Sequence, residues 1–149
     1  MDAHDPAFTP DEINEYVHKL EQAPDWIPQT DREKSIDKSL AVSAIAVALR
    51  RHAGHLSKES DPVMGITPGT PIGRDLRMVK HIYVAGGLFC YLSGEECRDI
   101  LDKAFCDPGI SLLPNSPEFC FDPQYTLYAM GVLSRHFPDA VLSYLKAFL

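Results

Sequence analysis

Residues 81–105 read HIYVAGGLFCYLSGEECRDILDKAF, and residues 126–149 read TLYAMGVLSRHFPDAVLSYLKAFL. Each stretch has small residues in its first half, then a turn, then an amphipathic second half. An offset of 44 positions pairs Gly87 with Gly131 and Leu101 with Leu145. Small residues let two helices approach closely, so the pattern predicts two repeat-like helical hairpins in the C-terminal half of the chain.

The second halves of these stretches, GEECRDILDKAF and FPDAVLSYLKAFL, resemble the second helix of a tetratricopeptide-type hairpin. Ala140, Tyr144 and Ala147 stand at the small, aromatic and small positions of that motif. The resemblance is confined to 81–105 and 126–149, and its spacing of 44 residues differs from the roughly 34 of the family. It implies a scaffold that binds other proteins and has no catalysis.

Outside these stretches, capping residues and apolar periodicity predict further helices. Thr9 and Pro10 begin one, and Thr30 or Asp31 begins another that contains LAVSAIAVAL, a run apolar on nearly all sides and therefore expected to be surrounded by other elements. The predicted helices cover 9–22, 31–58, 74–92, 95–105, 124–136 and 139 to the end. Proline and glycine predict irregular loops near 23–30, 60–73 and 107–123. We therefore expect 1–149 to form a single all-α domain, a bundle of five to six helices.

Charge and composition exclude several functional classes. The chain of 149 residues has a formal net charge of -7 and an ordinary content of apolar residues. Nucleic-acid affinity depends mainly on Lys and Arg, so an acidic chain without a dominant basic face is a poor candidate. No apolar run is long enough for a membrane span, and the N-terminus has no secretory pattern, so we expect a cytoplasmic protein with no membrane partner.

No catalytic, cofactor or metal motif stands out. The glycines of VAGGLF are expected to lie inside a helix, without the spacing of a dinucleotide fingerprint. The pairs Glu15/His18 and His52/His55 have metal-compatible spacing but lack further ligands nearby in sequence. Cys90 is expected to be a structural thiol, as are the other cysteines. We predict no cofactor and no metal.

Basic residues form the first candidate site. In a helix over 74–92, Arg74, Arg77 and His81 would occupy one face, with Lys80 beside them and the 60–73 loop next to them. This stripe is either a solvated face that pairs with the acidic N-terminal segment, or a docking patch for an acidic partner or an anionic small molecule.

Apolar residues in the irregular segments form the second candidate site: Trp26, Leu112, Leu113, Phe119 and Phe121. They either cover the core of the domain or contact a partner. The preferred function is a non-enzymatic protein-binding protein: an adaptor, a chaperone for a client protein, or a toxin-neutralising immunity-type partner. The alternative is an enzyme or sensor that binds an anionic small molecule at the basic stripe.

Overall fold

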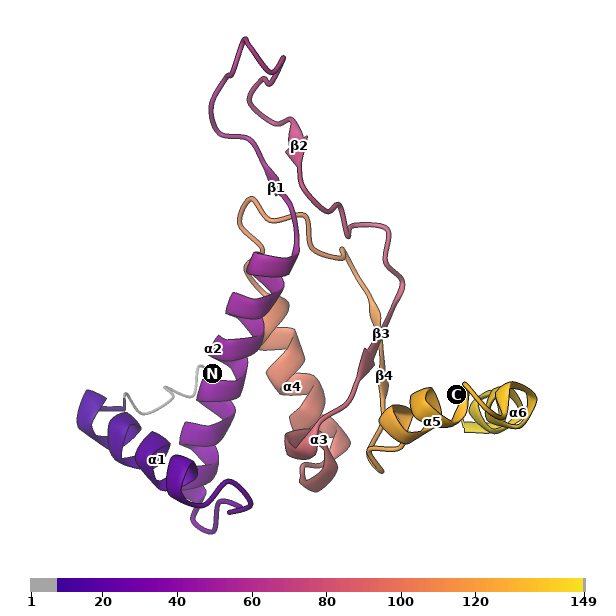
Figure 1. Cartoon of the computed structure of the whole chain (residues 1–149). Helices are drawn as coiled ribbons and strands as arrows, with labels where there is room; N and C mark the ends of the chain where they lie inside the picture. The colour runs from indigo at the N-terminus through magenta and orange to yellow at the C-terminus, as the bar shows by residue number, and fades with distance from the viewer. Residues whose placement is uncertain (1–7, 149) are drawn as a thin grey trace.

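Two threonines begin the first two helices of the computed structural model, which describes residues 8–148. Thr9 caps α1 (Pro10–Gln22) and Thr30 caps α2 (Asp31–His52), and each forms a capping box with the glutamate three positions later. The two helices form an open hairpin at one side of the molecule (Figure 1). A bidentate ion pair of 2.8 Å between Arg32 and Glu12 joins them.

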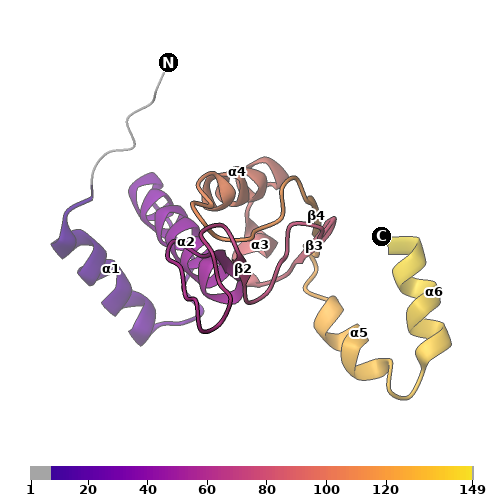
Figure 2. The ribbon, with the colours of Figure 1, turned by 90° about the horizontal axis from the view of Figure 1, so that it is seen from above.

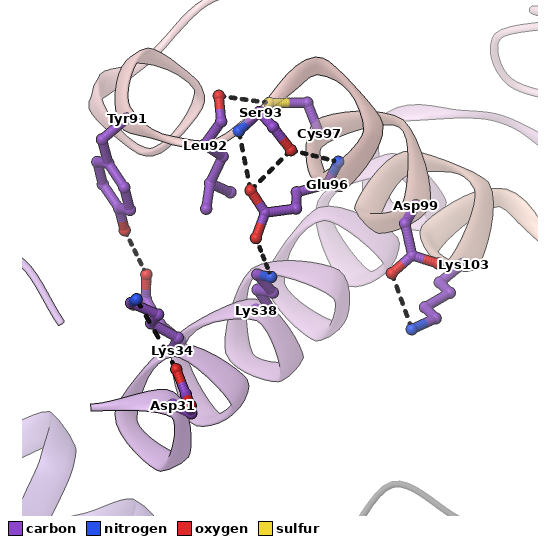
Figure 3. A network of polar contacts seen from close by, with 11 residues as sticks. Asp31, Lys34, Lys38, Tyr91, Leu92, Ser93, Glu96, Cys97, Asp99 and Lys103 are labelled. Atoms are coloured by element: carbon purple, nitrogen blue, oxygen red, sulfur yellow. Dashed lines mark hydrogen bonds and ion pairs between the residues drawn. The ribbon is translucent and has the colours of Figure 1, made fainter. Parts of the chain in front are cut away.

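The centre of the fold is the contact between α2 and α4 (Gly94–Phe105). Cys97, Ile100, Leu101 and Ala104 stand at i, i+3, i+4 and i+7 on α4, so they share one face, and all four are buried. Figure 3 shows Glu96 between the Ser93 cap and Lys38 on α2. One carboxylate therefore both caps α4 and forms the 2.5 Å ion pair that links it to α2.

Four short strands complete the middle of the chain. β1 (His55–Leu56) pairs antiparallel with β2 (Pro71–Ile72), and β3 (His81–Val84) pairs parallel with β4 (Glu118–Phe121), with His81 opposite Glu118 and Val84 opposite Phe121. The short α3 (Gly87–Tyr91) follows β3. Gly86, the residue before α3, has φ 143°, a backbone conformation that favours glycine.

The C-terminal part, α5 (Leu127–Leu133) and α6 (Pro138–Phe148), forms a helical hairpin. Figure 2 shows that it projects from the end of β4, away from the other helices. Asp122 fixes its start, because this fully buried carboxylate accepts hydrogen bonds from the backbone N–H groups of Thr126 and Leu127 and from the Thr126 hydroxyl. Burial raises the pKa of Asp122, but these bonds outweigh burial and the net pKa is lowered.

The all-α prediction is too simple, because the described part of the chain contains six helices and two small sheets. The predicted helix over 74–92 is wrong: residues 74–80 are irregular, 81–84 form a strand and only 87–91 are helical. Of the first repeat-like hairpin, the second helix forms as α4 but the first is reduced to the short α3, while the second hairpin exists as α5 and α6. Ala147 is one of the positions that resemble the tetratricopeptide motif, and its side chain is outside the part of the chain that the structure describes.

Two other expectations about helices also need correction. The second helix ends at His52 and not near Lys58, because Gly54 starts the excursion towards β1 and β2. The apolar run at 40–49 is not surrounded, since Val47 is 44% exposed. Among the described helices, none is long and apolar enough to cross a membrane.

The molecule is open for its size. The accessible surface of the whole chain, terminal residues included, is 10645 Å². A compact monomer of 16.6 kDa is expected to expose roughly 7,600 Å². Part of the surplus of about 3,000 Å² arises because the arm of residues 55–72, the α1–α2 hairpin and the α5–α6 hairpin extend in different directions (Figures 1 and 2).

Candidate functional site

The predicted basic stripe does not form. Because residues 74–80 are irregular, the side chains that a helix would align turn to separate neighbours. Arg77 donates two hydrogen bonds to Asp75, at 2.9 and 2.6 Å, and this pairing lowers the pKa of Asp75 to about 2. Arg77 is therefore occupied by a carboxylate two positions away.

The other members of the stripe are separated in the same way. His81 lies at the start of β3, 3.2 Å from the carboxylate of Glu118 on β4. Arg74 lies 3.0 Å from the ring of His52 at the end of α2. Lys80 is exposed, and its carbonyl accepts the Glu118 N–H. These groups do not converge on a shared anion site.

The apolar residues of the second loop cover the core. Leu112 is 1% exposed and Leu113 is also buried. Phe119 packs edge-on against Phe105 on α4, with ring centroids 5.5 Å apart. Phe121 packs against Phe89 on α3 at 6.4 Å. The structure thus places these four residues inside the fold or against it.

Trp26 has a different environment. Its ring packs edge-on against the buried Tyr16 at 5.8 Å, and the Lys19 ammonium lies 3.6 Å from the ring centroid. The half-buried Trp26 also lines an open groove of about 560 Å³ between the α1–α2 linker, α2 and α3.

A hydroxyl–carboxylate pair marks the edge of this groove. Tyr91 on α3 points towards α2 (Figure 3), where its hydroxyl donates a 2.5 Å hydrogen bond to Asp37. Burial and the Asp37 carboxylate raise the pKa of Tyr91. The Tyr16 hydroxyl is buried without a hydrogen bond among the described residues. The groove is an apolar depression with acidic groups at its edge, and Trp26 is the predicted site residue that it contains.

The 60–73 loop is ordered as the end of a projecting arm, residues 55–72, which extends at the top of Figure 1. Ser57 exchanges backbone hydrogen bonds with Thr70 and Gly69 near its base, and Asp61 exchanges two with Ile66 near its tip. The Asp61 carboxylate also accepts the N–H groups of Val63 and Met64, at 3.0 and 3.1 Å.

This geometry holds two apolar side chains in solvent. Val63 is 94% exposed and Met64 is 72% exposed. Sequence reasoning recognised the loop as unusual but missed these two residues, although DPVMG places them between turn-forming residues. The tip of the arm therefore presents an apolar surface to solvent.

The α5–α6 hairpin carries the other apolar surface. A shallow groove of about 230 Å³ between the two helices is lined only by apolar or aromatic side chains: Met130, Leu133, Phe137, Ala140, Val141 and Tyr144. Sequence reasoning considered the two helices of this stretch only as a hairpin and did not single out this surface.

The thiols and metal-ligating groups do not assemble a reactive centre in the described part of the chain. Cys97 is buried, and burial followed by the neighbouring Glu96 raises the pKa of its thiol. Cys90 is exposed, and its Sγ lies 3.4 Å from the Gly86 carbonyl. Among residues 8–148, no three His, Cys, Asp or Glu side chains are grouped so that they could hold a metal ion.

Comparison with known proteins gives a family and one curated relative. A protein-family model described as MutL protein matches residues 2–149. The chain is also similar to Protein MutL of Clostridium tetanomorphum, with 31% identity over 125 residues. That alignment covers 83% of this chain but only 26% of the relative, so the chain spans about a quarter of the relative's length. No solved structure shows a significant match.

Proposed function

The chain belongs to the MutL protein family, and we propose that it acts as a non-enzymatic protein-binding unit whose contact element is the arm, residues 55–72. The observation that carries this proposal is the exposure of Val63 and Met64 at a tip that backbone and Asp61 hydrogen bonds hold in shape. A tip whose backbone is preformed loses little backbone entropy on binding.

Charge indicates the kind of partner. Residues 38–80 contain seven basic and three acidic side chains, a net charge of +4 within a chain of -7. The basic residues lie mostly on the segments that flank the arm, since the charged side chains of the arm itself are Lys58, Glu59 and Asp61. Lys58 on the arm, and Arg51 and Lys80 on the segments before and after it, are exposed. The partner would offer an apolar pocket for the tip and an acidic rim for these cations, which steer association and are sensitive to salt.

An adaptor, a client chaperone and an immunity-type partner are three forms of this proposal, and the identity of the bound protein distinguishes them. We place the activity in the cytoplasm, without nucleic acid or membrane as a partner. Binding of an anionic small molecule has less support, because Arg77 and His81 are paired with carboxylates on separate segments.

The test compares two variants of the tagged chain as baits in its native host. Val63→Ser combined with Met64→Ser removes the apolar tip. Met78→Ser is the matched control, because Met78 is 83% exposed but lies outside the arm. We expect one protein to be retained by the parent and by the control but lost with the tip variant.

Purified partner and bait then give the kinetics. Loss of the apolar tip should raise the dissociation rate at least about tenfold, since buried apolar anchors act mainly on dissociation. Circular dichroism checks that both variants keep the parental helix content. A partner that binds the tip variant as tightly as the parent contradicts the arm as contact element.

A further inference from the structure

The α5–α6 hairpin exposes more apolar surface than two helices need for their own contact. Tyr128 and Val132 on α5, Phe137 at the turn and Leu142 on α6 are each more than half exposed. Beside them lies the apolar groove of about 230 Å³ between the helices. Apolar groups gathered in this way on a projecting element are typical of an interface.

Charge favours a second copy of this chain as the occupant. The whole chain has a net charge of -7, and residues 1–37 alone contain ten acidic and three basic side chains. Residues 122–149 contain two acidic side chains, Asp122 and Asp139, and two basic ones, Arg135 and Lys146. Their net charge is zero, so two copies can meet here without the repulsion that their N-terminal regions would cause.

The order of side chains on α6 is self-complementary. Asp139, Leu142 and Lys146 stand at i, i+3 and i+7, so they lie along one face of the helix. The exposed Leu142 lies near the midpoint between the two charges. Within residues 8–148, neither Asp139 nor Lys146 has a side-chain ion pair. When two such helices pack antiparallel about a two-fold axis at Leu142, each Asp139 faces Lys146 of the other copy, as an isologous interface requires.

We propose that the chain forms a symmetric dimer through its α5–α6 hairpins, in which the two α6 helices pack antiparallel about Leu142. The exposed apolar side chains of both hairpins then share one core of four helices. A standard interface buries roughly 800 Å² on each partner, which is the size of contact that a stable dimer of this kind requires. The arm remains free, so this dimer is independent of the proposed function.

Sedimentation of the full chain between about 1 µM and about 1 mM tests the proposal. We expect reversible dimers whose dissociation constant rises at least about tenfold in Leu142→Glu, because a charge would enter the apolar centre. Val47→Glu is the matched control: Val47 on α2 is exposed to a similar degree, 44% against 52% for Leu142. This control should dimerise like the parent.

Charge reversal tests the antiparallel register. Asp139→Lys alone places like charges opposite each other twice, and Lys146→Asp alone does the same, so each single variant should dimerise at least about tenfold more weakly. An equimolar mixture of the two single variants restores both attractive pairs and should form a mixed dimer. The double variant should also regain parental dimerisation.

The contrary outcomes are equally specific. A parent that stays monomeric at the highest concentration overturns the proposal. So does a dimer that Leu142→Glu leaves intact, or a mixture of the two charge variants that stays monomeric. Circular dichroism shows whether each variant is folded, and the restored mixture cannot be explained by misfolding of either variant.

Discussion

At the scale of single residues, Glu96 shows how one side chain connects local structure to packing. Its carboxylate accepts hydrogen bonds from the Ser93 N–H and hydroxyl, at 2.9 and 2.8 Å, and forms the 2.5 Å ion pair with Lys38. The Lys38 hydrogen bond and then the Ser93 backbone hydrogen bond lower the pKa of Glu96 from 4.5 to about 2. The S-G-E-E sequence predicts the cap, but the partner on α2 depends on the tertiary fold.

This lowered pKa predicts acid sensitivity. A carboxylate with a depressed folded-state pKa contributes stability that is present above its unfolded pKa and is lost as pH falls towards the folded value. The free energy of unfolding should therefore decrease between pH 4.5 and about 2. Glu96→Gln should cost about 1 kcal/mol at pH 7 and make that decrease shallower, measured by urea unfolding at several pH values.

Glu95→Gln provides the comparison, because Glu95 is an exposed carboxylate one position earlier on the same helix. It should keep the parental pH profile. If Glu96→Gln and the parent lose stability in parallel below pH 4.5, the Lys38–Glu96 link does not contribute as the geometry implies.

At the scale of elements, sequence reasoning located the helices that carry their own signals. α1, α2, α4 and α6 begin within one residue of the predicted starts, because caps and first-turn residues are local. β3 was missed because its pairing partner, β4, begins 37 positions later at Glu118. The EFCF segment has no clear alternation of polar and apolar residues, since its last three residues are apolar, and a four-residue strand is weak evidence without its neighbour.

The candidate site shows the same division. The proline and glycine content of 60–73 correctly marked an unusual loop, whereas the position of Val63 and Met64 at its tip depends on the Asp61–Ile66 pairing. The basic stripe does not form, because residues 74–80 are not helical and so do not align its side chains. Leu112 was predicted as a candidate partner residue, but it is 1% exposed. Its replacement should therefore unfold the domain and not accelerate dissociation of a partner.

Gly54 gives a prediction for the base of the arm. Its carbonyl accepts the Leu112 N–H, and its N–H donates to the Arg74 carbonyl. A Cβ atom at this position would lie 2.2 Å from the Ile72 carbonyl oxygen, so backbone would have to move. Gly54→Ala should therefore lower the free energy of unfolding by about 1–3 kcal/mol, measured by urea denaturation.

Gly94→Ala is the matched control, since a Cβ atom on Gly94 would meet nothing within 4 Å. At the first position of α4 it should leave stability unchanged or raise it slightly. Equal stability of the Gly54 and Gly94 variants would contradict the close backbone approach at the base of the arm.

At the scale of the whole molecule, the open shape connects the two proposals. The arm and the α5–α6 hairpin are separate projections from the α2–α4 core: in Figure 1 the arm extends at the top and the hairpin lies at the lower right. A partner at the arm and a second copy at the hairpin can therefore bind at the same time. Each would cover apolar groups that the chain itself leaves in solvent, which lowers the cost of the open fold.

The same open shape predicts a low urea m-value, which is the slope with which the free energy of unfolding falls as urea concentration rises. An unfolded chain of this mass exposes roughly 24,000 Å², so with 10645 Å² exposed when folded the chain buries about 56% of its surface. A compact domain of this length buries about 68–70%. Because the urea m-value scales with the surface exposed on unfolding, it should be about one-fifth below that of a compact domain of equal length.

Dilute protein should show this low m-value, followed by Trp26 fluorescence and by circular dichroism, with a compact domain of similar length measured in the same buffer as the control. As dimers form at higher concentration, the surface buried per chain increases, so the apparent m-value should rise towards that of the control. An m-value in dilute solution equal to that of the compact control would mean that the projections fold back onto the α2–α4 core. The apolar surfaces of the arm and hairpin would then be covered within one chain, and neither would be free to bind.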